Sequence, residues 1–79
     1  MDDKIKQDEI KIGINIRRIR KEQKIGQTEL VRMLNLDGID LTRETLVKIE
    51  RGTQHIKATQ LRAIRNSLNT TYDELMQSV

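Results

Sequence analysis

The sequence lacks cysteine, proline, phenylalanine and tryptophan, and Tyr72 is its only aromatic residue. Without cysteine, neither a disulfide framework nor a thiolate metal site can form, which fits a reducing cytoplasm. The near absence of rings argues against the single-stranded nucleic-acid platforms on which bases stack. No apolar run exceeds two residues, so the sequence predicts neither a transmembrane helix nor the apolar region of a signal peptide.

Charge is abundant and unevenly distributed. Charged residues make up 34% of the 79 residues, and the net charge is +3. Residues 1–9 carry four acidic and two basic side chains, whereas residues 10–24 carry six basic and one acidic. We interpret residues 1–9 as an acidic leader that can be disordered, followed by a basic helix typical of a phosphate-facing surface.

Helical periodicity dominates the rest of the chain. Ile12, Ile16 and Ile19 form one apolar stripe of a first helix that stops near Gly26. A second helix is expected from Gln27 to about residue 34. We expect a longer turn over residues 35–41, in which Leu36, Ile39 and Leu41 point inward.

Three further helices are expected. Thr42 and Thr71 are typical N-caps, with Glu74 completing a capping box after Thr71. Gly52 suits the end of the third helix, and a fourth helix is expected from about Thr59 to Leu68. The sequence therefore predicts an all-α, compact bundle of five short helices over residues 10–76, followed by a tail at 77–79.

In this order and at these spacings, the motifs resemble the Xre/Cro-type helix-turn-helix transcriptional regulators, which have lambda-repressor-like DNA-binding domains. The resemblance covers roughly Ile12 to Met76 and implies that helices 2 and 3 form the helix-turn-helix. The turn between them is longer than in phage repressors, which indicates a branch with a lengthened turn. The motifs are Ile12-Gly13-x-x-Ile16-Arg17-x-Ile19-Arg20-Lys21, Gln27-x-Glu29-Leu30 and Thr42-Arg43-x-Thr45-Leu46-x-Lys48-Ile49-Glu50-Arg51-Gly52.

The third helix carries the polar side chains that a major-groove reader needs, because each base pair displays a distinct donor and acceptor pattern there. Arg43 could pair with guanine or bind a phosphate, and Glu44 could accept a hydrogen bond from cytosine. Thr45 could touch a thymine methyl group, and Lys48 could reach a guanine or the backbone. Glu44 has an equally plain interpretation, namely that it only complements the helix dipole.

A second group of residues is expected to bind phosphates, which fixes register without reading sequence. The resemblance implies that the start of the second helix clamps the DNA backbone and that the loop after the third helix lies along the other strand. The predicted phosphate-binding residues are Arg17, Gln27, Thr28, Thr42, Arg51, Thr53, Gln54 and Lys57. The resemblance also implies that Arg20 and Glu50 form a structural ion pair between the first and third helices.

Catalysis is not expected. His55 is the only histidine, and it has no partner at a spacing typical of a metal site or a catalytic triad. We therefore predict no catalytic residue, no metal and no cofactor.

The leading hypothesis is a cytoplasmic regulator, specific for sequences in double-stranded DNA, that acts as a repressor. It would bind as a homodimer to a pseudo-palindromic operator. The expected dimer surface comprises Tyr72, Leu75, Met76 and Val79, unless Leu75 and Met76 only close the bundle; Ile10 and Ile14 offer a competing surface. An alternative is the antitoxin of a toxin–antitoxin pair, which would also bind a protein partner. A third possibility is a protein-interaction module that has lost DNA binding.

Overall fold

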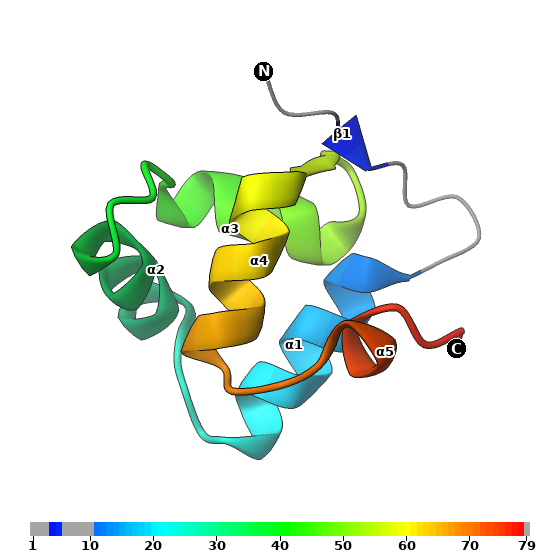
Figure 1. Ribbon diagram of the computed structural model, residues 1–79. Coiled ribbons are helices and arrows are strands. Elements are labelled where there is room, and N and C mark those ends of the chain that lie inside the picture. Colours follow the sequence, from blue (N-terminus) through cyan, green and yellow to red (C-terminus); the bar gives the residue numbers. More distant parts are fainter. Residues whose placement is uncertain (1–3, 6–10, 79) are drawn as a thin grey trace.

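The computed structural model describes residues 4–5 and 11–78. Five helices account for most of the chain, and their arrangement is shown in Figure 1. Two strands of two residues each pair antiparallel, with Lys4 opposite Lys57 and Ile5 opposite Ile56. In order, the elements are β1 (Lys4–Ile5), α1 (Ile12–Glu22), α2 (Gln27–Leu36), α3 (Arg43–Arg51), β2 (Ile56–Lys57), α4 (Ala58–Ser67) and α5 (Tyr72–Leu75).

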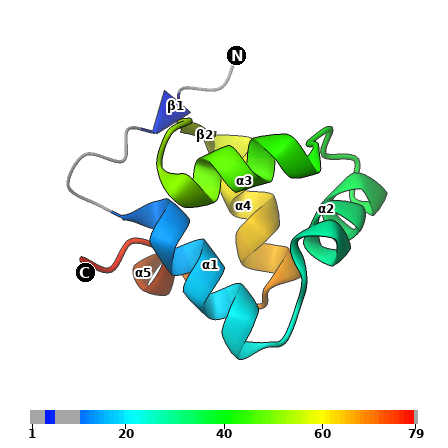
Figure 2. The ribbon, with the colours of Figure 1, turned by 180° about the vertical axis from the view of Figure 1, so that it is seen from behind.

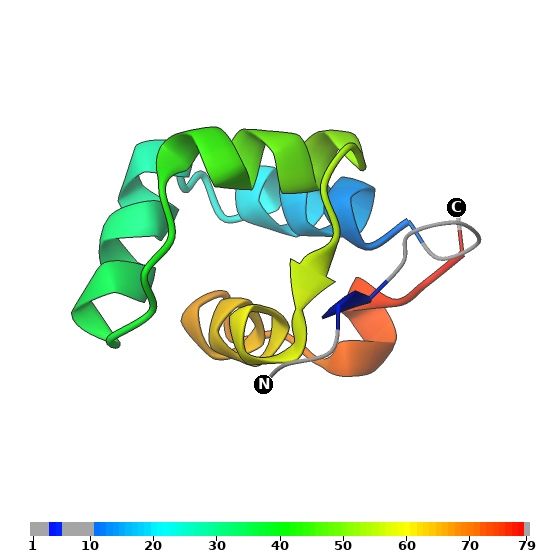
Figure 3. The same cartoon turned by 90° about the horizontal axis from the view of Figure 1, so that it is seen from above.

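The helices surround one aliphatic core. Figure 3 shows α1 and α3 side by side along one side of the molecule, with α4 on the other side and α2 across one end. In Figure 2, where the molecule is seen from behind, α3 crosses in front of α4. The buried apolar residues are Ile12, Ile16, Ile19, Leu30, Leu34, Leu41, Leu46, Ile49, Ile56, Leu61, Ala63, Ile64, Leu68 and Leu75. The five-helix bundle predicted from the sequence is confirmed.

The predicted helix ends are largely confirmed as well. The Thr42 hydroxyl accepts a hydrogen bond from the Thr45 amide at 3.1 Å, and the Thr71 hydroxyl accepts one from the Glu74 amide at 3.1 Å. Each cap satisfies an amide at the helix start that would otherwise lack a partner. Gly52 ends α3 in the left-handed conformation.

The long turn between α2 and α3 is held by local hydrogen bonds. Asn35 donates through Nδ2 to the carbonyl oxygens of Ile39 at 2.8 Å and Leu41 at 3.1 Å. Gly38 has φ +83°, a conformation that costs other residues free energy, and Leu41 is buried. These contacts fix how far α3 begins from the end of α2.

One expectation about this turn was wrong. Leu36 does not point inward but is 82% exposed. The reason is that α2 continues through Leu36 instead of ending near Leu34. Two residues along a helix differ by about 200° in direction, so a side chain two positions after buried Leu34 faces solvent. Ile39 is half-buried against the core, as expected.

The strand pair was not anticipated. Within the predicted leader, residues 4–5 form β1 against β2, and the remaining residues of 1–9 lie outside the described part of the chain. The proposed domain boundaries therefore stay a prediction.

Gly13 allows α1 and α3 to approach each other closely. A Cβ atom placed on Gly13 would overlap the Ile49 carbonyl oxygen and would lie 2.9 Å from that of Glu50. The neighbouring atoms belong to the backbone of α3, so they cannot move aside without shifting the helix. Glycine is therefore required inside a helix whose stability it lowers.

We predict that Gly13→Ala lowers the thermal unfolding midpoint. Alanine should gain about 1 kcal/mol of helix propensity, but overpacking against a rigid backbone costs roughly 1–3 kcal/mol or more. Gly26→Ala is the matched control: a Cβ there meets nothing within 4 Å, so this variant loses only the preference for glycine over alanine at a helix N-cap. Calorimetry on both variants decides the point: a midpoint for Gly13→Ala at or above that of the native chain would contradict the close packing.

Candidate nucleic-acid interface

A buried ion pair joins the first and third helices. Arg20 Nε lies 2.9 Å from Glu50 Oε2, and Arg20 Nη2 lies 2.9 Å from Glu50 Oε1. The side chains are 8% and 2% exposed. Arg20 also donates through Nη1 to the Ile25 carbonyl oxygen at 2.9 Å. The expected pair between α1 and α3 is thus present, with the two-pronged geometry that suits guanidinium and carboxylate.

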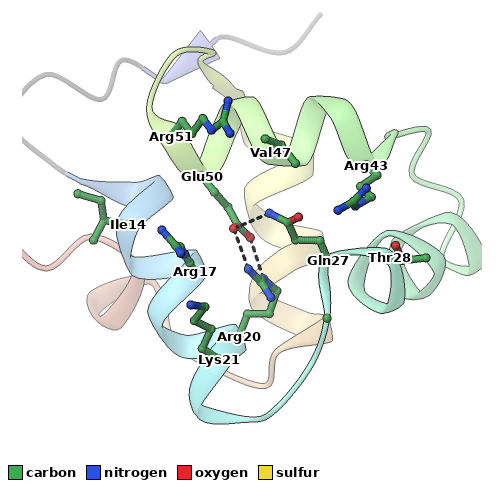
Figure 4. Close-up of a pocket in the computed structure, with 11 residues that line it drawn as sticks. Ile14, Arg17, Arg20, Lys21, Gln27, Thr28, Arg43, Val47, Glu50 and Arg51 are labelled. Carbon is green, nitrogen blue, oxygen red and sulfur yellow. Dashed lines mark hydrogen bonds and ion pairs between the residues drawn. The ribbon is translucent and has the colours of Figure 1, made fainter.

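The start of α2 binds to the same carboxylate. Gln27 donates through Nε2 to Glu50 Oε1 at 3.1 Å, so three helices meet at one side chain (Figure 4). The predicted role of Gln27 in phosphate binding is untested, but its side-chain nitrogen already has a partner within the protein. The N-cap of α2 is Gly26, which has no side chain that could accept a hydrogen bond from the first amides of the helix. Within the described residues, the backbone amides of Gln27 and Thr28 donate no hydrogen bond. Such a helix start attracts anions.

Beside this junction lies an open groove of about 840 Å³. It runs between α1, the start of α2 and one side of α3, and Figure 4 shows its side chains converging from all three helices. The lining residues are Ile14, Arg17, Arg20, Lys21, Gly26, Gln27, Thr28, Arg43, Val47, Glu50 and Arg51.

The groove carries a strong positive charge. Arg17, Lys21, Arg43 and Arg51 are exposed, and the described part of the chain offers none of them an ion pair. Arg20 does not add to this charge because Glu50 neutralises it. Like charges that converge without counter-charges focus a positive potential, which favours a polyanionic partner.

The exposed face of α3 carries the predicted base readers beside this groove. Glu44 and Lys48 form an ion pair one turn apart, with Nζ 3.4 Å from Oε1 and side chains 80% and 52% exposed. An ion pair this exposed to water contributes little stability. Glu44 and Lys48 can therefore give up their ion pair and bind to a partner outside the protein instead. Thr45 is half-buried, and its hydroxyl accepts a hydrogen bond from that of Thr42 at 3.0 Å. Neither threonine lines the groove.

The loop after α3 brings few of its predicted phosphate-binding residues to the groove. Arg51 lines it, whereas Thr53, Gln54 and Lys57 do not. Thr53 donates through its hydroxyl to the Lys48 carbonyl oxygen at 3.2 Å. The Lys57 amide donates to Gln60 Oε1 at 2.9 Å and so helps to start α4, while the Lys57 side chain is exposed.

Some residues that line the groove were not assigned to the site or to the Arg20–Glu50 pair from the sequence. They are Ile14, Lys21, Gly26 and Val47. Lys21 and Val47 each lie four residues from a predicted contact, at Arg17 and Arg43 respectively. Residues with that spacing share a helix face, so the signal was available in the sequence.

Two features are absent from the part of the chain that the structure describes. Among the described residues, no group of three or more histidine, cysteine, aspartate or glutamate side chains could hold a metal ion. Within the same part of the chain, no helix is both long and apolar enough to cross a membrane.

Comparison with known proteins identifies the class. The helix-turn-helix domain family matches residues 13–79, and the chain belongs to this family. The predicted Xre/Cro-like regulator is thereby confirmed, and the family is one of DNA-binding regulators and not of enzymes.

A solved structure shares the fold. It is the crystal structure of the restriction-modification controller protein C.AhdI from Aeromonas hydrophila, with a TM-score of 0.70. The two sequences are 24% identical, and the match covers 86% of this chain and 96% of that chain. No curated protein sequence gave a significant match.

We predict that Arg20→Ala destabilises the fold by about 3–5 kcal/mol, because it leaves the Glu50 carboxylate buried without its partner. Arg17→Ala removes an exposed arginine from the same helix and should barely change stability. Replacing Arg20 and Glu50 together by methionine should cost less than Arg20→Ala alone. Chemical denaturation measures all three; an Arg20→Ala variant as stable as the native chain would rule out a structural role for the pair.

Proposed function

We propose that this DNA-binding regulator reads a specific sequence in double-stranded DNA by placing α3 in the major groove. The observation that carries the proposal is the convergence of four exposed cations, from α1 and α3, on a groove beside the open start of α2. A B-DNA major groove admits one α-helix. The cations flanking α3 would then lie against the phosphates that border that groove.

The side chains divide into two roles. We assign the cations beside α3 to phosphates: Arg17 and Lys21 of α1, and Arg51 on the flank of α3. The free amides at Gln27 and Thr28 are assigned to phosphates as well. Arg43, at the first position of α3, reaches bases or a phosphate. Glu44 and Lys48 face outward and can break their exposed ion pair to accept from cytosine and donate to guanine. The remaining candidates, Thr42, Thr45, Thr53, Gln54 and Lys57, stay predictions with less structural support.

We further propose a homodimer that represses transcription from a pseudo-palindromic operator in the cytoplasm. The expected dimer surface needs adjustment, because Leu75 is fully buried in its own bundle. Tyr72 is 38% exposed, and Met76 is partly buried against the core. Val79 and Ile10 lie outside the described residues. The fold shared with a restriction-modification controller protein supports a regulatory role of this kind.

Binding to the DNA upstream of its own gene, measured across a salt series, tests the proposal. Specific affinity should fall steeply with salt, because each neutralised phosphate releases counterions. We predict that Arg17→Ala lowers the slope of log affinity against log salt by about one. Arg62→Ala is the matched control: it removes an exposed arginine on α4, outside the groove.

An Arg17→Ala slope equal to the native slope, or an equal loss in Arg62→Ala, would contradict the assignment of this face. Recovery of a tightly bound protein partner with the DNA-bound chain would instead favour the antitoxin alternative.

A further inference from the structure

Val47 occupies an unusual position in the groove. It lies one turn after Arg43 and one turn before Arg51, and all three line the groove from α3. Its side chain is half-buried, and Figure 4 shows it between the two arginines. Among the described residues that line the groove, the other aliphatic one is Ile14, which belongs to α1. An apolar group therefore sits in the middle of the charged flank of α3.

Apolar side chains on a groove-reading helix have one chemical target in DNA. In the major groove, the base edges offer nitrogen and oxygen atoms throughout, and thymine alone adds a C5-methyl group. A branched aliphatic side chain can exclude water from that methyl group but cannot pair with the polar edges. We propose that Val47 is a specificity-determining residue that contacts the C5-methyl group of one thymine in each half-site. This inference rests on the proposed function.

The sequence predicts this contact for Thr45, but the geometry of Thr45 is less suitable. Thr45 and Val47 are two residues apart on α3 and so point in directions that differ by about 200°. The Thr45 hydroxyl is held by that of Thr42 at the start of the helix, and Thr45 lies outside the groove. Val47 follows Glu44 by three residues and so lies only about 60° around the helix from this proposed base reader. It therefore approaches the base edges when α3 enters the major groove, while its neighbours in the groove meet the phosphates.

A purely structural role for Val47 must be separated from contact with DNA. Val47 precedes Glu50 by three residues and so lies on the neighbouring turn of the helix, where it could simply shield the Arg20–Glu50 pair from water. A structural role would change stability on truncation but would not distinguish thymine from uracil, which differ only in the methyl group. The test therefore varies the DNA as well as the protein.

The experiment begins with selection of preferred duplexes from a random pool by the full chain. Each thymine of the selected site is then replaced singly by 2′-deoxyuridine, and the affinity of the native protein is measured. We expect an affinity loss of about fourfold at one thymine per half-site, which is the effect of burying one methyl group. Other thymines should show little change.

The variant Val47→Ala should abolish this difference, so that thymine and uracil at that position bind equally well. Val31→Ala is the matched control, since Val31 is a half-buried valine of α2 that packs on the core and lies outside the groove. That variant should retain the fourfold ratio.

A selected site without any sensitivity to uracil would overturn the inference, as would a ratio that survives in Val47→Ala. Both results leave the proposed function intact. Failure of the pool to yield any preferred sequence would instead overturn the proposed function and the inference together.

Discussion

The buried Glu50 carboxylate is the group on which the DNA-binding face depends. It accepts hydrogen bonds from Arg20 of α1 and Gln27 of α2, and it belongs to α3. A buried charge is costly without compensation, so the carboxylate favours only the arrangement in which all three helices meet. Gly13 tightens the same junction, because its missing side chain lets α1 approach the backbone of Ile49 and Glu50. The junction therefore sets the position of α3 relative to the start of α2.

This junction also determines which charges face outward. By pairing with Arg20, Glu50 removes one cation from the groove and leaves Arg17, Lys21, Arg43 and Arg51 available to a partner. The four are spread over two helices that the junction holds rigidly together. Preorganised cations lose less conformational entropy on binding than cations on mobile segments. Structure and function are thus coupled through one side chain: a change at Glu50 would alter both the fold and the spacing of the phosphate-binding groups.

Much of this could be predicted from the sequence, because it depends on local rules. The spacing of apolar residues predicted the helices. Thr42 and Thr71 predicted where two of them begin, and the structure confirms both N-caps. The Arg20–Glu50 pair followed from a family resemblance rather than from any local pattern. Leu36 was placed wrongly because the exposed side of a helix can carry leucine, and periodicity does not reveal where a helix ends. The Asn35 side chain shapes the turn through hydrogen bonds to the carbonyl oxygens of Ile39 and Leu41. These bonds form only once the backbone of the turn has folded back, and the spacing of residues does not predict that. The pairing of Lys4–Ile5 with Ile56–Lys57 links distant parts of the chain, which no local pattern reports.

The most direct measurement of the central claim is an NMR titration of the isotope-labelled chain with a selected duplex. If α3, α1 and the start of α2 form the binding face, the largest amide shifts should fall at Arg17, Thr28 and the exposed positions of α3. The hollow between the α2–α3 turn and α4, lined by Asp37 and Arg62 among others, should shift little. Shifts centred on that hollow, with α3 unaffected, would contradict the account.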